Sequence, residues 1–476
     1  MYQNITLRQL GLCALLLATA TGCDKVLDQT PPFALTQEDA FANADRIQKS
    51  AVGMYDQLQN AEFLGGRALI YSDIRSDDTN PAGFFGGIGT FNPLANDGTV
   101  TNAWTGGYRT IYGPNFFLQQ IAKNPGKVSP TLEQNYIGEA KFIRALTYFH
   151  LVNLFAQPYN FTADASHLGV VLQLDAPDAA TAFDASQAKP RSTVKEVYTQ
   201  IEKDLTEAIV GLPETYTTTF DKTARATKDA ARTLLSRVYL YEGRYADAAR
   251  LAGEVVTGGR HSLTSTPAVP FTLATFSNVE SIFSVAMNVS DNPNTNNALG
   301  QHYGRRFDIS VNPYALIPVA QFPADDRRRL LLLTPSTIPT STSSPLVYTK
   351  KYNEASADYV PITRYAETLL NRAEGLAQTT GVTAEAVSLL NLVRDRSKPA
   401  TSVSYTISSF ANAQALVDAI LLERRLELAF EGHRYYDLMR YKRNSSRITY
   451  GAEKAILPIP QVDILQNPNL VQNPGY

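Results

Sequence analysis

The stretch LLSRVYLYEGRYADAARLAGEVV, residues 234–256, carries the pattern that decides the fold. Apolar and small residues recur at helical spacing on both sides of Gly243, which predicts two helices joined at that glycine. The spacing is that of a tetratricopeptide repeat, in which small residues let two helices approach closely and aromatic residues fill the gaps. The matching positions are Leu235, Tyr239, Gly243, Tyr245, Ala248 and Ala252.

Two further parts of the chain repeat this pattern more loosely. A copy with one inserted residue spans 365–396, and a split copy pairs 132–155 with 193–212. One helix pair cannot bury its apolar faces alone, so such units need stacked neighbours. We therefore expect a mostly α fold, built as a scaffold of tetratricopeptide-like helix pairs.

Long loop-like stretches rich in Gly, Pro, Asn, Ser and Thr interrupt the scaffold. They span 74–110, 156–192, 258–362 and 397–411. Inside the third stretch, SIFSVAM (281–287) and SPLVYTKKY (344–352) have β-type composition and predict a few short hairpins. Binding sites commonly lie on long loops held by a rigid scaffold. We expect residues 36–476 to form one domain whose insertions bind the ligand.

The first 23 residues resemble the export and lipidation signal of bacterial lipoproteins. Leu10–Ala18 is a short apolar run, whereas a membrane-spanning helix needs about 20 apolar residues. Small residues precede Cys23, which predicts a signal peptide over 1–22, acylation of Cys23 and a lipidated leash over 23–35. A disulfide between Cys13 and Cys23 is the alternative, although Cys13 lies in the removable segment. Two or three acyl chains anchor a protein stably, where one is marginal.

The charge balance limits the classes of partner. The chain has 43 basic and 45 acidic residues, for a net charge of −2. Phosphate binding needs a basic excess, so we expect no nucleic acid and no polyanionic ligand as the main partner. The five histidines show no metal-ligand spacing, so we expect no catalytic metal and no cofactor.

Several segments, in order along the chain, resemble the SusD/RagB family. They are the leader ending in Cys23, EAKFIRALTYFHLVNLF (139–155), RYAETLLNRAEGLA (364–377), ILLERRLELAFEGHRYYDLMRYKR (420–443) and LPIPQVDILQNPNLVQNPGY (457–476). Members of this family are surface lipoproteins of Bacteroidetes that capture nutrients for a SusC-like TonB-dependent outer-membrane transporter. The resemblance implies four helix pairs, a transporter on the scaffold side and ligand held by the loops. It also implies a lipid-anchored protein on the outer membrane, facing the exterior.

The charged residues of segment 420–443 are predicted to have a structural role and no catalytic one. Its acids and arginines lie three or four residues apart, a spacing at which they pair along a helix. We expect a buried charge network that pins the C-terminal segment, and no catalytic residues. The prolines of 457–476 predict an extended strap across the surface.

The candidate ligand site centres on TNAWTGGYRTIYGPNFFLQQI, which contains Trp104 and, at helical spacing, Tyr108. Relatives carry an aromatic-centred segment here, and some stack it on sugar rings; core packing is the alternative. Polar residues just upstream could hydrogen-bond sugar hydroxyls, with a solvated loop as the alternative. These are Asp73, Arg75, Asp77 and Asp78. Further candidates in the third insertion are Tyr303, Arg305 and Tyr314.

Three classes of function follow. The first is a nutrient-binding protein that delivers a glycan, or a peptide as in RagB-like uptake, to its transporter. The second is a surface-anchored hydrolase, and the third is a repeat scaffold with protein partners only. The resemblance favours the glycan-binding protein.

Overall fold

The structure is a computed structural model that describes residues 37–178, 180–182, 184–272, 274, 276–294, 296–334 and 345–476. The predicted signal peptide, Cys23 and the lipidated leash lie outside these residues. Across the described ranges, no helix combines the length and the apolar character needed to cross a membrane. Helices dominate the regular structure, which confirms the mostly α prediction.

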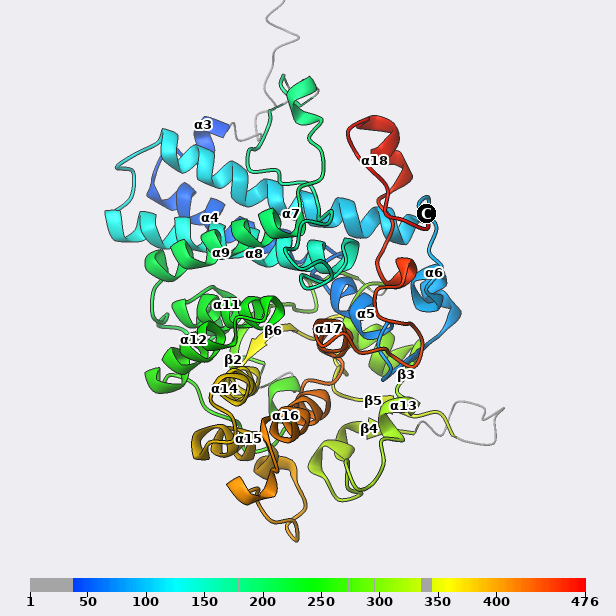
Figure 1. The fold of residues 1–476 in the computed structure, drawn as a ribbon. Coiled ribbons are helices and arrows are strands. Elements are labelled where there is room, and N and C mark those ends of the chain that lie inside the picture. The colour runs from blue at the N-terminus through cyan, green and yellow to red at the C-terminus, as the bar shows by residue number, and fades with distance from the viewer. Residues whose placement is uncertain are drawn as a thin grey trace, which may run out of the picture.

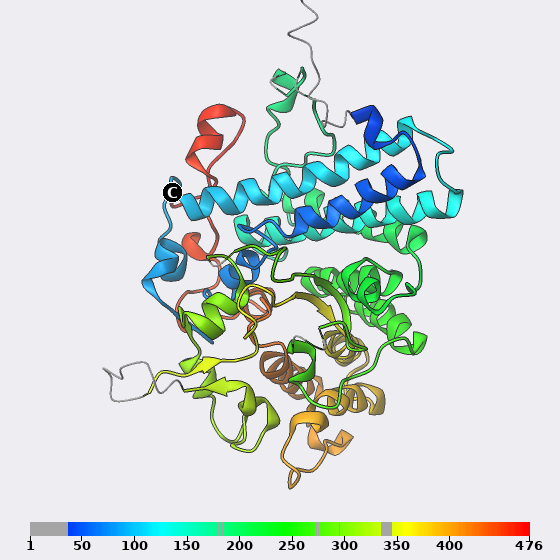
Figure 2. The same cartoon turned by 180° about the vertical axis from the view of Figure 1, so that it is seen from behind.

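Four helix pairs form the scaffold of the described chain. They are α4 (Ala44–Leu58) with α7 (Gly98–Lys123), α8 (Pro130–Phe155) with α9 (Val194–Gly211), α11 (Lys228–Glu242) with α12 (Tyr245–Gly258), and α14 (Tyr365–Thr380) with α15 (Ala384–Ser397). The pairs stack along one side of the molecule, and loop-rich segments gather on the other side (Figure 1). The view from behind shows the same division (Figure 2). The repeat predicted around Gly243 and its two copies are confirmed.

Local sequence signals place these helices. Gly243 adopts φ 76°, a left-handed conformation that favours glycine, and thereby ends α11. Thr193 and Glu196 form a capping box that starts α9. Gly375 permits the close approach of α14 to α12, because a Cβ there would lie 2.5 Å from the Tyr245 carbonyl oxygen.

Shorter helices complete the fold. The α-helices are α3 (Gln37–Ala40), α5 (Arg67–Asp73), α6 (Gly86–Thr90), α10 (Thr219–Ala224), α13 (Asn312–Ala315), α16 (Ala413–Glu427), α17 (Arg434–Arg440) and α18 (Gln461–Gln466). The 3-10 helices are Gly83–Phe85, Ala185–Gln187, Val269–Phe271, Arg327–Leu331, Ile407–Ser409 and Glu453–Ala455, and Gln301–Arg305 is a π-helix. The predicted insertion 74–110 is therefore helical from Gly98 onward, while the described residues of 156–192 are loop apart from one 3-10 turn and an isolated bridge at Leu168.

The strands form three small antiparallel sheets. They are β1 (Asn80–Pro81) with β3 (Ile309–Ser310), β2 (Ser281–Val285) with β6 (Val360–Arg364), and β4 (Leu332–Leu333) with β5 (Tyr348–Thr349). Strands β2 and β5 lie inside the two predicted β-type runs, 281–287 and 344–352, but β2 pairs with the distant β6 and forms no local hairpin. The pairing of β2 with β6 is long-range, since residues 286–359 separate the two strands in the sequence, and both strands are fully buried.

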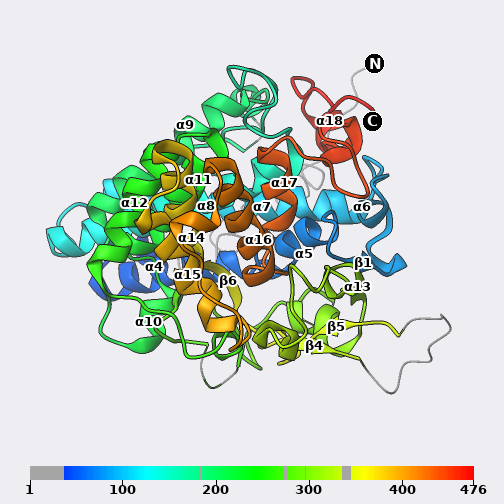
Figure 3. The ribbon, with the colours of Figure 1, turned by 60° about the horizontal axis from the view of Figure 1, so that its bottom comes forward.

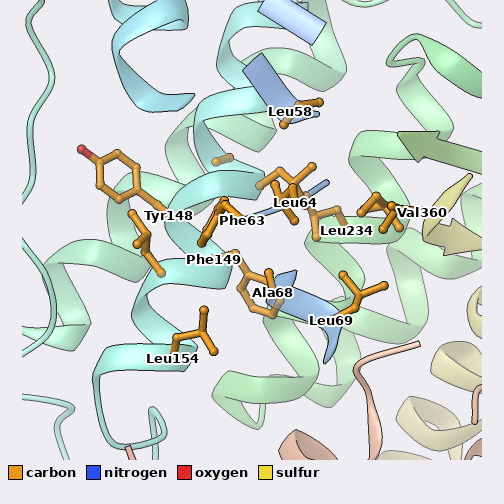
Figure 4. Packing of buried hydrophobic residues seen from close by; sticks show 14 of the residues in the cluster. Leu58, Phe63, Leu64, Ala68, Leu69, Tyr148, Phe149, Leu154, Leu234 and Val360 are labelled. Carbon is orange, nitrogen blue, oxygen red and sulfur yellow. The ribbon is translucent and has the colours of Figure 1, made fainter. Parts of the chain in front are cut away.

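One large core joins the first three helix pairs to the loop-rich side. Leu64 and Leu69, from α5 and the loop before it, lie among Phe149 of α8, Leu234 of α11 and Val360 of β6 (Figure 4). A smaller separate cluster holds α14, α15 and α16 together. The loop-rich side is thus fixed to the scaffold by apolar packing.

The buried charge network predicted for the C-terminal segment is confirmed. Glu427 lies 2.5 Å from Arg396 and 3.3 Å from Arg364. Glu431 lies 2.7 Å from Arg364 and 2.6 Å from Lys351. All five side chains are almost fully buried, so these pairs tie the end of α16 to β6 and α15.

Candidate functional site

The structure brings Trp104 and Tyr108 together at one pocket of about 610 Å³, which we call the Trp104 pocket. Helix α7 supplies both aromatic residues, and the 156–192 insertion and α18 supply the other walls. The polar lining residues are Gln173, Asp184, Gln187, Asp463, Gln466 and Asn467.

Hydrogen bonds fix the 156–192 insertion against the C-terminal strap. The side-chain amides of Asn467 and Asn469 donate to the Lys189 and Ala188 carbonyl oxygens, at 2.9 and 2.6 Å. Arg191 donates to the Val471 carbonyl oxygen at 3.0 Å. Segments nearly 300 residues apart thus meet, as Figure 1 shows where α18 stands beside the insertion. The predicted strap is extended only in part, because Gln461–Gln466 forms α18, and this helix supplies one wall of the pocket.

The aromatic wall is tightly packed. The Trp104 ring lies 4.8 Å from that of Tyr108 and 4.9 Å from that of Phe155, and Trp104 is only 3% exposed. Tyr108 is half-buried, and its hydroxyl donates to the Val171 carbonyl oxygen at 2.9 Å. Trp104 therefore lies mainly in the core and supports Tyr108, so its predicted contact with a ligand is restricted to the small exposed part of the ring.

The charged side chains in the described lining of the Trp104 pocket are all acidic. Asp184 and Asp463 line it, and no Lys, Arg or His is among its described lining residues. Burial raises the pKa of Asp463, and a hydrogen bond with the Trp104 side chain opposes that rise. Gln173 donates to Gln187 at 2.8 Å, which holds both amides at the wall. The pocket thus offers amide and carboxylate groups to hydroxyls and would repel an anion.

The other predicted ligand residues lie elsewhere and make internal contacts. The Tyr303 hydroxyl donates to Asp73 at 2.9 Å, and Tyr314 donates to the Leu426 carbonyl oxygen at 3.0 Å. Arg75 donates to the Ala455 carbonyl oxygen at 3.0 Å. Each of these side chains is at most 2% exposed, so ligand contact would require these bonds to break.

The two remaining aspartates of that group pair with arginines of the C-terminal segment. Asp77 lies 2.8 Å from Arg434, and Asp78 lies 2.5 Å from Arg425. The 73–78 stretch is accordingly part of the fold's internal charge network, and the solvated-loop alternative does not describe it either. Arg305 is exposed at the end of the π-helix and does not line the Trp104 pocket.

Sequence reasoning missed the polar wall of the pocket. The segment QVDILQNPN, residues 461–469, supplies Asp463, Gln466 and Asn467, whereas its prolines predict only a strap. Its density of amide side chains between two prolines was the available signal. What the sequence does not show is that this segment stands opposite α7.

Comparisons with known proteins agree with this architecture. Residues 26–240 match the family described as "Starch-binding associating with outer membrane", and residues 346–455 match the "SusD family". The SusD-like protein P2 of Formosa agariphila is 27% identical and is aligned over 97% of this chain and 98% of its own.

Solved structures extend the match to the fold. A SusD superfamily protein from Bacteroides fragilis has 29% identity and a TM-score of 0.78, over 91% of this chain and 100% of its own. A laminarin binding SusD-like protein has 26% identity and a TM-score of 0.71, with the same coverage. The chain belongs to the SusD/RagB family.

Proposed function

We propose that this protein binds a neutral glycan in the Trp104 pocket and passes it to a SusC-like TonB-dependent transporter. The observation that carries this proposal is the make-up of the pocket: an aromatic wall, several amides and two carboxylates, with no cation among the described lining residues. The laminarin binding relative supports a glucan as the first ligand to test.

The chemistry of a neutral sugar fits these walls. The C–H groups of a pyranose pack on an aromatic side chain, and its hydroxyls donate to carboxylates and exchange hydrogen bonds with amides. A uronate or sulfate would bring an anion beside Asp463 and Asp184, with no lining cation to compensate it. The pocket therefore favours neutral glycans over acidic ones.

The test is calorimetric titration of the purified chain with laminarin oligosaccharides and with alginate oligosaccharides. Gln466→Ala should weaken laminarin binding about five- to tenfold, the order of one lost hydrogen bond. Gln461→Ala is the matched control, because Gln461 is exposed on the same helix and does not line the pocket. Equal affinity of Gln466→Ala and Gln461→Ala, or preferred binding of alginate, would refute the assignment.

Binding without cleavage separates this proposal from the hydrolase alternative. We expect laminarin incubated with the protein to show no new reducing ends. A peptide library titrated in parallel tests the RagB-like alternative. Tight peptide binding that Gln466→Ala weakens would replace the glycan assignment.

The anchor and the transporter partner rest on the family assignment and on the sequence around Cys23. We propose that acylated Cys23 holds the protein on the exterior of the outer membrane, with the helix stack toward the transporter. Cys23→Ala should release the protein from the membrane fraction of the native host. Retention of that variant in the membrane would contradict the lipid anchor.

A further inference from the structure

A second pocket lies away from the Trp104 pocket, between α4, α10 and β2, and has a volume of about 370 Å³. We call it the Gly53 pocket. Its apolar walls are Leu58, Phe283, Val285, Met287 and the rings of Tyr55 and Tyr359. Figure 3 shows α4 and α10 on the opposite side of the molecule from α18. The glycan site proposed above and this pocket therefore share no wall.

Gly53 leaves part of the Gly53 pocket open. It lies in the middle of α4, and a Cβ at this position would meet nothing within 4 Å. Packing does not require a glycine there, and glycine costs about 1 kcal/mol relative to alanine inside a helix. Gly53 lines the pocket and is exposed, so a longer side chain has room there to reduce the open volume.

Apolar side chains at the mouth of the Gly53 pocket are left in water. Val52 is 48% exposed and Phe220 is 53% exposed, and both line the pocket. The buried walls behind them continue the same apolar surface. A ligand with an aromatic or branched aliphatic group would cover this surface and gain from its burial.

Three of the four charged residues in the described lining of the pocket are acidic. Asp56, Asp221 and Asp291 line the pocket, and within the described part of the chain no ion pair neutralises any of them. The Gln59 amide donates to Asp291 at 3.2 Å, and the Thr218 hydroxyl donates to Asp221 at 2.7 Å, but both donors are neutral.

The cation that lines the pocket is already compensated. Arg225 lies 2.6 Å from Glu139, which is fully buried, and its guanidinium lies 4.6 Å from the Tyr216 ring centroid. Burial lowers the pKa of Arg225, but the Glu139 charge and the other neighbours together raise it by more, so the guanidinium stays charged and paired with Glu139. The pocket thus combines an apolar interior with an uncompensated negative rim.

We propose that the Gly53 pocket is a second binding site, for a ligand in which an aromatic or branched aliphatic group is joined to a positively charged amine. Its volume is at the small end of the range for ligand sites, which run from about 300 to 1,000 Å³, and suits one aromatic group with a short linker. Charge complementarity with the three aspartates selects the amine. A free hydrophobic amine and a peptide with a basic residue beside an apolar one share this chemistry.

The test compares three probes that share an indole-ethyl group and end in a cationic amine, a neutral amide or an anionic carboxylate. Tryptamine, indole-3-propionamide and indole-3-propionate are titrated into the purified mature protein by calorimetry. Tryptamine should bind tightest and the propionate weakest, and added salt should reduce the tryptamine affinity. The dipeptide Lys-Phe amide, titrated beside tryptamine, distinguishes a peptide source from a free amine. Equal binding of the three indoles, or no binding of any, overturns the proposal.

Two variants test whether tryptamine binds in the Gly53 pocket. Gly53→Leu fills the open space and should abolish binding of tryptamine, while helix propensity predicts an unchanged or higher Tm. Asp56→Asn should weaken tryptamine about threefold and leave the neutral propionamide unchanged. Laminarin titration in both variants reports whether the fold and the Trp104 pocket are intact. Unchanged tryptamine affinity in Gly53→Leu would overturn the assignment, whatever the outcome for laminarin.

Discussion

Asp73 gives the sharpest test of how the C-terminal segment is held. Its carboxylate is buried at the end of α5, where it accepts hydrogen bonds at 2.9 Å from the Tyr303 hydroxyl and from the Gly432 backbone N–H. It therefore joins three segments that are far apart in the sequence. Burial raises the pKa of Asp73 from 3.8 to about 7, and the two hydrogen bonds oppose part of that rise.

The sign of the pH dependence follows from this shift. The folded protein holds the Asp73 proton more tightly than the unfolded chain, so between about pH 4 and pH 7 unfolding releases a proton. The stabilisation is fully present below about pH 4 and is lost as the pH rises through about 7. An interval of about three pH units, at ~1.4 kcal/mol per unit, corresponds to about 4 kcal/mol in the free energy of unfolding.

The assay is urea denaturation of the wild type and of Asp73→Asn at a series of pH values from 4 to 8. Other groups titrate alike in both proteins, so the difference between the two curves isolates Asp73. We expect the wild type to lose about 4 kcal/mol more than the variant across this range. Tyr303→Phe removes a bond to the ionised carboxylate, so it should move the wild-type transition to higher pH. Parallel curves for the wild type and Asp73→Asn would refute the reasoning.

Three further predictions concern stability and are measured by chemical denaturation. Glu427→Gln removes one of the carboxylates shared by Arg396 and Arg364, which both keep Glu280, and should cost about 1–3 kcal/mol; a loss below 1 kcal/mol would show that the network contributes little. Gly375→Ala should destabilise by about 1–3 kcal/mol, because its Cβ would meet α12, whereas Gly53→Ala should stabilise by up to about 1 kcal/mol. A change of the same sign in both variants would contradict the different surroundings of the two glycines. Thr193→Ala removes the capping box of α9 and should cost about 1 kcal/mol, and no change in the midpoint would count against it.

The scaffold was predictable because its signals are local. Gly243, the small residues of α12 and the capping residue Thr193 act within one or two turns of the chain. The start of α7 was not predictable in the same way, because its glycines give the segment a loop-like composition. Gly107 is in fact a contact position, since a Cβ there would lie 2.5 Å from the Leu151 side chain on α8. The need for a glycine at this position therefore comes from contact with a helix more than 40 residues away in the sequence.

The candidate site was predicted only in part for a related reason. Trp104 and Tyr108 could be found because they share a helix face, and both line the pocket. Asp77 and Asp78 look like ligand contacts in the sequence because they are polar residues just upstream of the aromatic segment around Trp104. Their arginine partners, Arg434 and Arg425, lie about 350 residues later in the sequence. A single sequence does not show which distant cation a carboxylate will meet.

An arginine partner marks several of the structural carboxylates in this protein, although Asp73 is held by hydrogen bonds from Tyr303 and Gly432. Asp78 and Glu427 lie within 2.5 Å of a guanidinium, and their charge is used in holding the fold together. Asp56 and Asp463 line pockets, and among the described residues neither forms an ion pair. A ligand group can bind a carboxylate that forms no ion pair without first breaking a buried pair. Breaking such a pair would by itself cost several kcal/mol. Among the described residues, each of the two pockets therefore has a carboxylate free of ion pairs, which can select a neutral hydroxyl or an amine over an anion.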